Sequence, residues 1–168
     1  TSADNCYRNS ALAKMADYLL NNPHIGLVYA NVQLINESGA PLQGSPYRRH
    51  EQSDADSSVL LLPSSGDTLC EFNDNFINSC FMYRRQLADA VGRYNPSYMG
   101  YEDYDYWLRL LQIAPIAHID SDEPLYQYRL HENSLTARLS GNTLSQRQRS
   151  LVLRTQSARK YTSGNVAL

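Results

Sequence analysis

Two hydrophobic periods alternate along this chain, and they constrain its fold more than any other feature. Apolar residues recur every three or four positions in some segments, as in an amphipathic helix, and form short β-branched runs in others. The predicted helices are 11–20, 84–91, 102–113 and 144–160. The predicted strands are 25–35, bent near Asn31, then 77–83, 116–119 and 125–130. This alternation predicts an α/β fold with a mixed sheet and flanking helices.

The composition excludes several classes of protein. With 168 residues, 42% of them hydrophobic, the chain is long enough and apolar enough to bury a core, which argues against disorder. Fifteen basic against 17 acidic residues give a net charge of −2, so we expect no nucleic-acid partner. The apolar runs, such as 59–62, are too short to span a membrane. Three widely spaced cysteines, Cys6, Cys70 and Cys80, are predicted to be reduced and buried.

The strongest local signal is the segment 100–110, which reads GYEDYDYWLRL. Acidic residues in the first turn of a helix complement the helix dipole, and Asp105 is spaced to pair with Arg109. A second interpretation is catalytic. Eight of the 13 tyrosines lie within 83–128 and would line a cleft in which Glu102 or Asp103 acts as a general base.

Three further acidic or histidine motifs have both a structural and a functional interpretation. Ser2-Ala3-Asp4-Asn5 precedes a helix and can cap it, and His131 leaves a predicted strand, where an exposed or structural histidine is common. The triplet Asp54-Ala55-Asp56 spells Asp-x-Asp but lies in the least regular region of the chain, 43–75. It is predicted to be a solvated loop.

Taken together and in this order, the motifs resemble the second half of a family 2 glycosyltransferase with the GT-A fold. The resemblance covers 1–137. It depends most on the Gly-x-Glu-Asp-x-Asp-x-x-x-Arg helix of 100–109 and on the Tyr-Arg-x-His-x-x-Ser-x-Thr ending of 128–136. It implies a partial nucleotide-diphospho-sugar transferase fold that lacks the N-terminal nucleoside-binding half. This part begins at the Asp-x-Asp-type metal motif of the family, which Ser2-Ala3-Asp4-Asn5 matches here. The residues 138–168 would form a separate basic helix and tail.

The resemblance also implies roles for individual residues. Asp4 and His131 would hold Mg²⁺ or Mn²⁺ at the diphosphate of the donor, and Arg129 and His131 would contact that diphosphate. Asp103 would be the general base that deprotonates the acceptor hydroxyl, supported by Glu102. The implied reaction transfers a sugar from a nucleotide-diphosphate donor to a saccharide or another hydroxyl acceptor, with inversion at the anomeric carbon.

Further expectations follow from reading the chain as the acceptor-side part of a longer enzyme. The isolated chain would be inactive, and a homo-oligomer would cover its sheet edges. The basic tail would rest on the domain, contact a membrane surface or join another domain, in a cytoplasmic protein that is free or peripheral at the membrane. One alternative is a non-catalytic interaction or scaffold domain. A weaker one is a metal-dependent hydrolase built on Glu102, Asp103 and Asp105.

Overall fold

The computed structural model describes residues 4–48, 51–71, 75–77, 79–98 and 100–132, so the predicted helix 144–160 and the tail 138–168 lie outside it. The helices are α1 (Ala11–Asn21), α2 (Thr68–Glu71), α3 (Arg85–Val91) and α4 (Glu102–Leu111), with a 3-10 turn η2 (Pro96–Tyr98). The strands are β1 (Cys6–Tyr7), β2 (Leu27–Ala30), β3 (Val32–Ile35), β4 (Val59–Leu60), β5 (Phe81–Tyr83), β6 (Ile116–Ile119) and β7 (Tyr126–Arg129).

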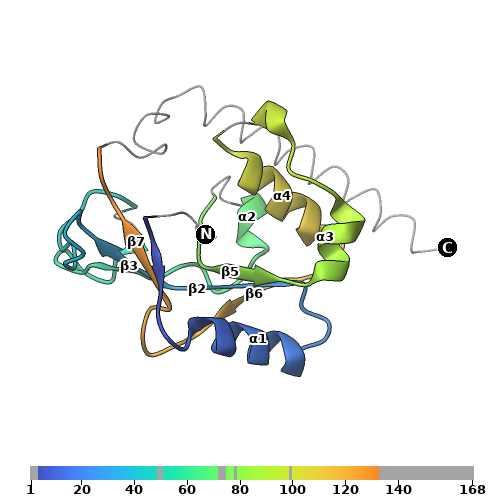
Figure 1. Ribbon diagram of the computed structural model, residues 1–168, viewed down its shortest axis with the longest axis horizontal. Coiled ribbons are helices and arrows are strands. Elements are labelled where there is room, and N and C mark those ends of the chain that lie inside the picture. The colour runs from blue at the N-terminus through green and yellow to red at the C-terminus, as the bar shows by residue number, and fades with distance from the viewer. Residues whose placement is uncertain (1–3, 49–50, 72–74, 78, 99, 133–168) are drawn as a thin grey trace.

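The strands form two small mixed sheets. One has the order β5-β2-β6, with β2 parallel to β6 and antiparallel to β5. The other has the order β1-β7-β3-β4, in which β3 and β7 are parallel and the outer strands are antiparallel. Helix α1 covers one face of the β5-β2-β6 sheet and α4 covers the other (Figure 1). The predicted α/β class is therefore confirmed, and the architecture is consistent with part of a nucleotide-sugar transferase fold.

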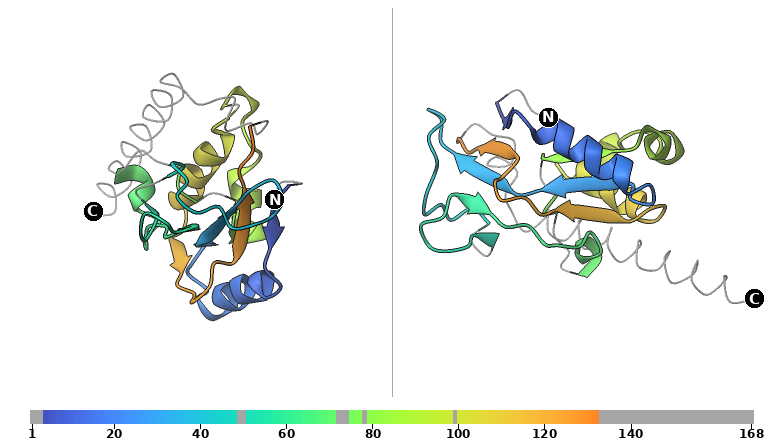
Figure 2. Two further views of the ribbon diagram at one scale, coloured as in Figure 1. Left: turned by 90° about the vertical axis from the view of Figure 1, so that its left-hand side faces the viewer. Right: turned by 90° about the horizontal axis from the view of Figure 1, so that it is seen from below.

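The predicted bend at Asn31 is confirmed, and it divides one apolar run into β2 and β3 (Figure 2). Asn31 is buried, and its Oδ1 accepts a hydrogen bond from the Leu62 N–H at 2.9 Å. The same oxygen lies 2.9 Å from Nε2 of His118, so the imidazole donates there. Its backbone carbonyl accepts from the Leu125 N–H at 3.1 Å. Asn31 thus ties the junction of β2 and β3 to β6 and to the segments that follow β4 and precede β7.

The core lies on both faces of β2, whose four residues are fully buried. Met15 of α1 and Trp107 of α4, both 0% exposed, belong to the same apolar cluster. A strand covered on both faces is apolar at every position rather than at alternate ones, which explains the continuous apolar sequence of β2.

Several local predictions need correction. The residue that precedes α1 is Ser10, which makes no side-chain capping bond, so the predicted cap by the polar segment around Asp4 and Asn5 is wrong. Cys6 is exposed, whereas Cys70 and Cys80 are buried as predicted. The short elements β1 and α2 were not predicted, and strand 77–83 is reduced to β5. Within the described ranges, the helices lack the length and apolar character needed to cross a bilayer.

Candidate functional site

Asp4 and His131, which are 127 positions apart, are brought together by strand pairing. Strand β1 runs antiparallel to β7, with Cys6 opposite Gln127, so the residues just before β1 meet those at the end of β7. Oδ2 of Asp4 lies 2.9 Å from Nε2 of His131. The Asn5 side chain extends the pairing, because its Oδ1 accepts from the Arg129 N–H at 2.7 Å. The two ends of the described chain therefore form one polar cluster.

Arg129 fixes the backbone around this cluster. Its Nε donates to the carbonyl of Asp4 at 2.9 Å, and its Nη1 donates to those of Asn36 and Glu37 at 2.7 and 2.8 Å. The guanidinium thus joins the segment before β1 to the turn after β3. The diphosphate contact that the resemblance implies for Arg129 stays a prediction, and its bonds in the structure position the segment that contains Asp4.

The donor atoms of the Asp4–His131 pair are of the kind that a divalent cation takes. A carboxylate oxygen suits Mg²⁺ and Mn²⁺, and an imidazole nitrogen suits transition metals. In the part of the chain that the structure describes, no three His, Cys, Asp or Glu side chains gather closely enough to hold a metal ion on their own. A cation at this pair would need its other ligands from elsewhere, such as the oxygens of a bound ligand.

The second polar centre is the first turn of α4, which contains Glu102 and Asp103. The Asp103 carboxylate accepts a hydrogen bond from the Tyr104 N–H at 2.7 Å and another from the Asn75 side chain. Burial raises the pKa of Asp103 above its ordinary value, and the charge of Glu102 raises it further, against the opposing effect of these hydrogen bonds. A desolvated carboxylate with a raised pKa is a common general base.

Asn75 is a residue of this centre that the sequence did not indicate. Since a carboxylate accepts hydrogen bonds, the amide nitrogen of Asn75 donates to Asp103. The buried Oδ1 of Asn75 has no hydrogen-bond partner among the residues that the structure describes. The Asn75 carbonyl accepts from Nη1 of Arg48 at 3.3 Å, and Arg48 is paired with the buried Glu51 at 2.5 Å. Arg48 and Asn75, at two described positions of this irregular region, therefore support the Asp103 carboxylate.

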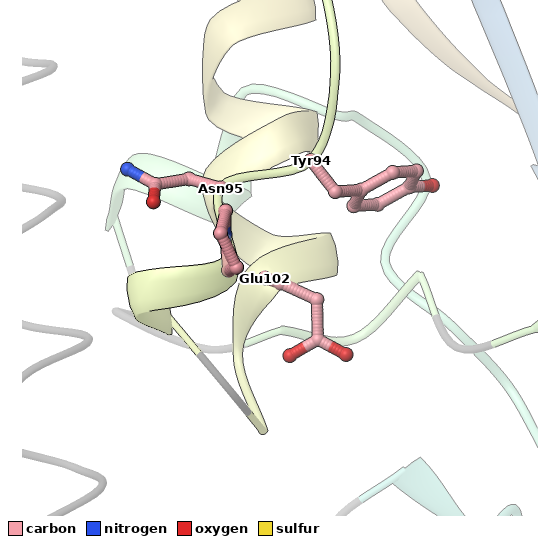
Figure 3. Close-up of a pocket in the computed structure, with 4 residues that line it drawn as sticks. Tyr94, Asn95 and Glu102 are labelled. Carbon is pink, nitrogen blue, oxygen red and sulfur yellow. The ribbon is translucent and has the colours of Figure 1, made fainter.

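Glu102 borders an open pocket of about 280 Å³ that is also lined by Tyr94, Asn95 and Pro96. Its Oε2 accepts a hydrogen bond from the Gly100 N–H at 2.5 Å. Figure 3 shows the Tyr94 ring and the Asn95 amide pointing in opposite directions from the loop before η2. The pocket thus combines an aromatic ring, a proline and a carboxylate.

The predicted tyrosine wall is wrong for half of its eight tyrosines, which are buried. Tyr101, Tyr104 and Tyr106 of the 100–110 segment are buried in the core, and Tyr104 donates its hydroxyl proton to the Leu69 carbonyl at 2.6 Å. The tyrosine that lines the pocket is Tyr94, which is 40% exposed. The excess of tyrosine therefore reflects core packing more than a groove.

Two other groups of acidic residues singled out in the sequence have the structural roles predicted for them. The carboxylate of Asp105 is paired with Arg109 at 2.9 Å, as the spacing predicted, so it does not join Asp103 as the hydrolase interpretation requires. Asp54 and Asp56 are exposed, and Oδ1 of Asp54 accepts from the Asp56 N–H, as expected of a solvated loop.

Comparison with known proteins relates the chain to glycosyltransferases. A Haemophilus influenzae protein named "Uncharacterized glycosyltransferase" is 25% identical over 135 residues, which are 80% of this chain and 40% of that protein. The O-antigen biosynthesis glycosyltransferase WbnJ of Escherichia coli is 28% identical over 124 residues, which are 73% of this chain and 43% of WbnJ. The chain thus spans about two fifths of each relative. No protein-family model matches it.

Proposed function

We propose that this chain is the acceptor-side part of an inverting, metal-dependent glycosyltransferase of family 2 with the GT-A fold. It would transfer a sugar from a nucleotide-diphosphate donor to the hydroxyl of a saccharide or another acceptor. The observation that carries the proposal is the similarity of most of the chain to two proteins named glycosyltransferases. The geometry of the two polar centres supports its details.

On the donor side, we assign Asp4 and His131 to the metal ion and the diphosphate. Their side chains already lie within 2.9 Å of each other, and Arg129 holds the Asp4 backbone in place. A divalent cation held there would neutralise the charge that develops on the departing diphosphate.

On the acceptor side, we assign Asp103 as the general base. Its carboxylate takes the proton of the acceptor hydroxyl, whose oxygen then forms a bond to the anomeric carbon from the face opposite the diphosphate. The bond from that carbon to the diphosphate oxygen breaks, so the configuration inverts. Burial, which raises the pKa of Asp103, makes it a stronger base than an exposed aspartate. Glu102 supports this centre beside the pocket.

A non-catalytic interaction domain derived from such an enzyme is the second candidate. The observation that favours it is that the described residues include no group of three metal-ligating side chains, while the chain spans about two fifths of its relatives. An active intact protein would contradict this alternative.

The test is release of the nucleoside diphosphate by the intact protein, measured with Mn²⁺ and a panel of UDP-, GDP- and dTDP-sugars. We expect release that needs an acceptor and is abolished by EDTA. Asp4→Asn and His131→Ala should weaken Mn²⁺ binding in the presence of the nucleotide. Binding is measured as the decrease in the EPR signal of free Mn²⁺. Asp56→Asn, in the exposed second triplet, is the matched control and should bind as wild type. Metal binding that is unchanged in Asp4→Asn would contradict the assignment.

A further inference from the structure

Tyr94 is an aromatic side chain that is rigidly held and yet open to solvent. Its ring stacks on that of Tyr106, with centroids 4.3 Å apart and an interplanar angle of 15°. Its hydroxyl group hydrogen-bonds the side chain of Tyr83. Tyr106 is itself buried and has the guanidinium of Arg109 4.9 Å from its ring centroid. A platform fixed in this way loses little conformational entropy when a ligand binds to it.

The pocket beside this platform has the size and the chemistry for one sugar ring. Its volume of about 280 Å³ lies just below the range for drug-sized ligands, which begins at about 300 Å³. The rings of Tyr94 and Pro96 offer apolar surface to the C–H face of a pyranose. Glu102 offers an acceptor for hydroxyl protons, because Oε2 takes the Gly100 N–H and Oε1 has no partner in the described ranges.

The charges around the pocket favour an uncharged ligand. The carboxylates of Glu102 and Asp103 are neighbours, and their interaction contributes to the raised pKa of Asp103. Among the described residues, those that line the pocket include no lysine or arginine. The nearby Arg109 guanidinium is engaged by Asp105 at 2.9 Å and by the Val91 carbonyl at 2.8 Å. A phosphate or carboxylate on the ligand would therefore be repelled, whereas neutral hydroxyl groups would not.

Resting on the proposed function, we infer that Tyr94, Pro96 and Glu102 bind an uncharged sugar ring of the acceptor, so that Tyr94 determines acceptor specificity. The ring stacks on Tyr94 and donates hydroxyl protons to Glu102, next to Asp103. The acceptor class is thus narrowed from any hydroxyl compound to a neutral saccharide.

The first test is saturation-transfer NMR on this chain with methyl glycosides of glucose, galactose and N-acetylglucosamine, and with glycerol 3-phosphate as the anionic probe. We expect transfer to the C–H protons of at least one glycoside and none to glycerol 3-phosphate. Tyr94→Ala should weaken glycoside binding about tenfold or more, and Tyr94→Phe, which keeps the stacking ring, should retain it. Tyr18→Ala is the matched control, because Tyr18 lines a separate pocket on α1, on the far side of the sheet (Figure 1).

The outcomes separate this inference from the proposed function. Absence of glycoside binding to wild type, stronger binding of glycerol 3-phosphate, or wild-type affinity in Tyr94→Ala would each overturn the inference. If Tyr94→Ala does not fold, Tyr94→Phe and the Glu102→Gln variant decide, since the latter should weaken glycoside binding with the platform intact. In an active intact protein, Tyr94→Ala should raise the acceptor KM with little change in kcat. An unchanged KM refutes this inference alone. No transfer by a wild-type protein that still binds the glycoside at Tyr94 refutes the proposed function and leaves the sugar-binding site standing.

Discussion

Replacing Arg129 by alanine removes three hydrogen bonds that position the Asp4–His131 pair. The guanidinium donates to the carbonyls of Asp4, Asn36 and Glu37 at 2.7 to 2.9 Å. A hydrogen bond from a charged donor contributes roughly 1.5–3 kcal/mol, and partial exposure reduces each of these bonds to about 1 kcal/mol. Arg129→Ala should therefore lower the free energy of unfolding by about 2–3 kcal/mol. Arg129→Lys should lose about half as much, because an ammonium cannot reproduce the planar fork.

The assay is urea unfolding followed by the fluorescence of Trp107, the one tryptophan, which is fully buried. With a slope of about 2 kcal/mol per M, the midpoint should fall by about 1 M or more. Arg8→Ala is the matched control, since Arg8 is exposed and donates to Gln33 at 2.7 Å. Its effect should stay below about 0.5 kcal/mol. An Arg129→Ala midpoint equal to that of the control would refute the positioning role of Arg129.

Three further predictions concern the packing that shapes the sheets. Asn31→Ala leaves the buried Leu62 N–H without its acceptor and should destabilise the chain by about 2–4 kcal/mol in urea unfolding; a loss below about 0.5 kcal/mol would be contrary to this. Burial lowers the pKa of His118, so the unfolded chain takes up a proton first and stability should fall as pH drops below about 6.5. If the urea-unfolding midpoint of His118→Gln varied with pH as that of wild type does, His118 would not be the source of the pH dependence. Gly66→Ala would place a Cβ 2.4 Å from Cβ of Ile116 and should cost about 1–3 kcal/mol, read as a lower Tm, and an unchanged Tm would speak against close packing there.

Local patterns were sufficient for the regular elements. The helical spacing of apolar residues predicted α1 and α4, and α3 ends where expected, at Gly92, whose φ of 82° suits glycine. The apolar run that becomes β2 and β3 was also predicted, including its bend at Asn31. In these segments one short stretch of sequence decides both the element and the face that it buries.

Long-range contacts decided the rest. Strand β1 has two residues and exists because it pairs with β7, more than a hundred positions away, so no local period signals it. That pairing also takes Asp4 away from α1, which corrects the predicted cap. The partners of Asp103 and Arg129 are likewise distant in the sequence. Asn75, which binds Asp103, lies in a region without hydrophobic periodicity. Arg129 binds the backbone carbonyls of Asn36 and Glu37, and residue type does not indicate which carbonyls accept a hydrogen bond.

The most direct test of the account is kcat/KM for sugar transfer by the intact protein with Asp103→Asn. General-base catalysis by one side chain contributes about 10²- to 10⁴-fold, so we expect kcat/KM of Asp103→Asn to fall by that factor with donor binding unchanged. The control is Asp89→Asn, at an exposed site on α3, which should transfer the sugar as wild type does. Because the pKa of Asp103 is raised by burial, wild-type kcat/KM should fall with acidity at a pH above the ordinary aspartate value of about 3.9. Transfer by Asp103→Asn at the wild-type rate, with the same acidic limb, would contradict the central claim.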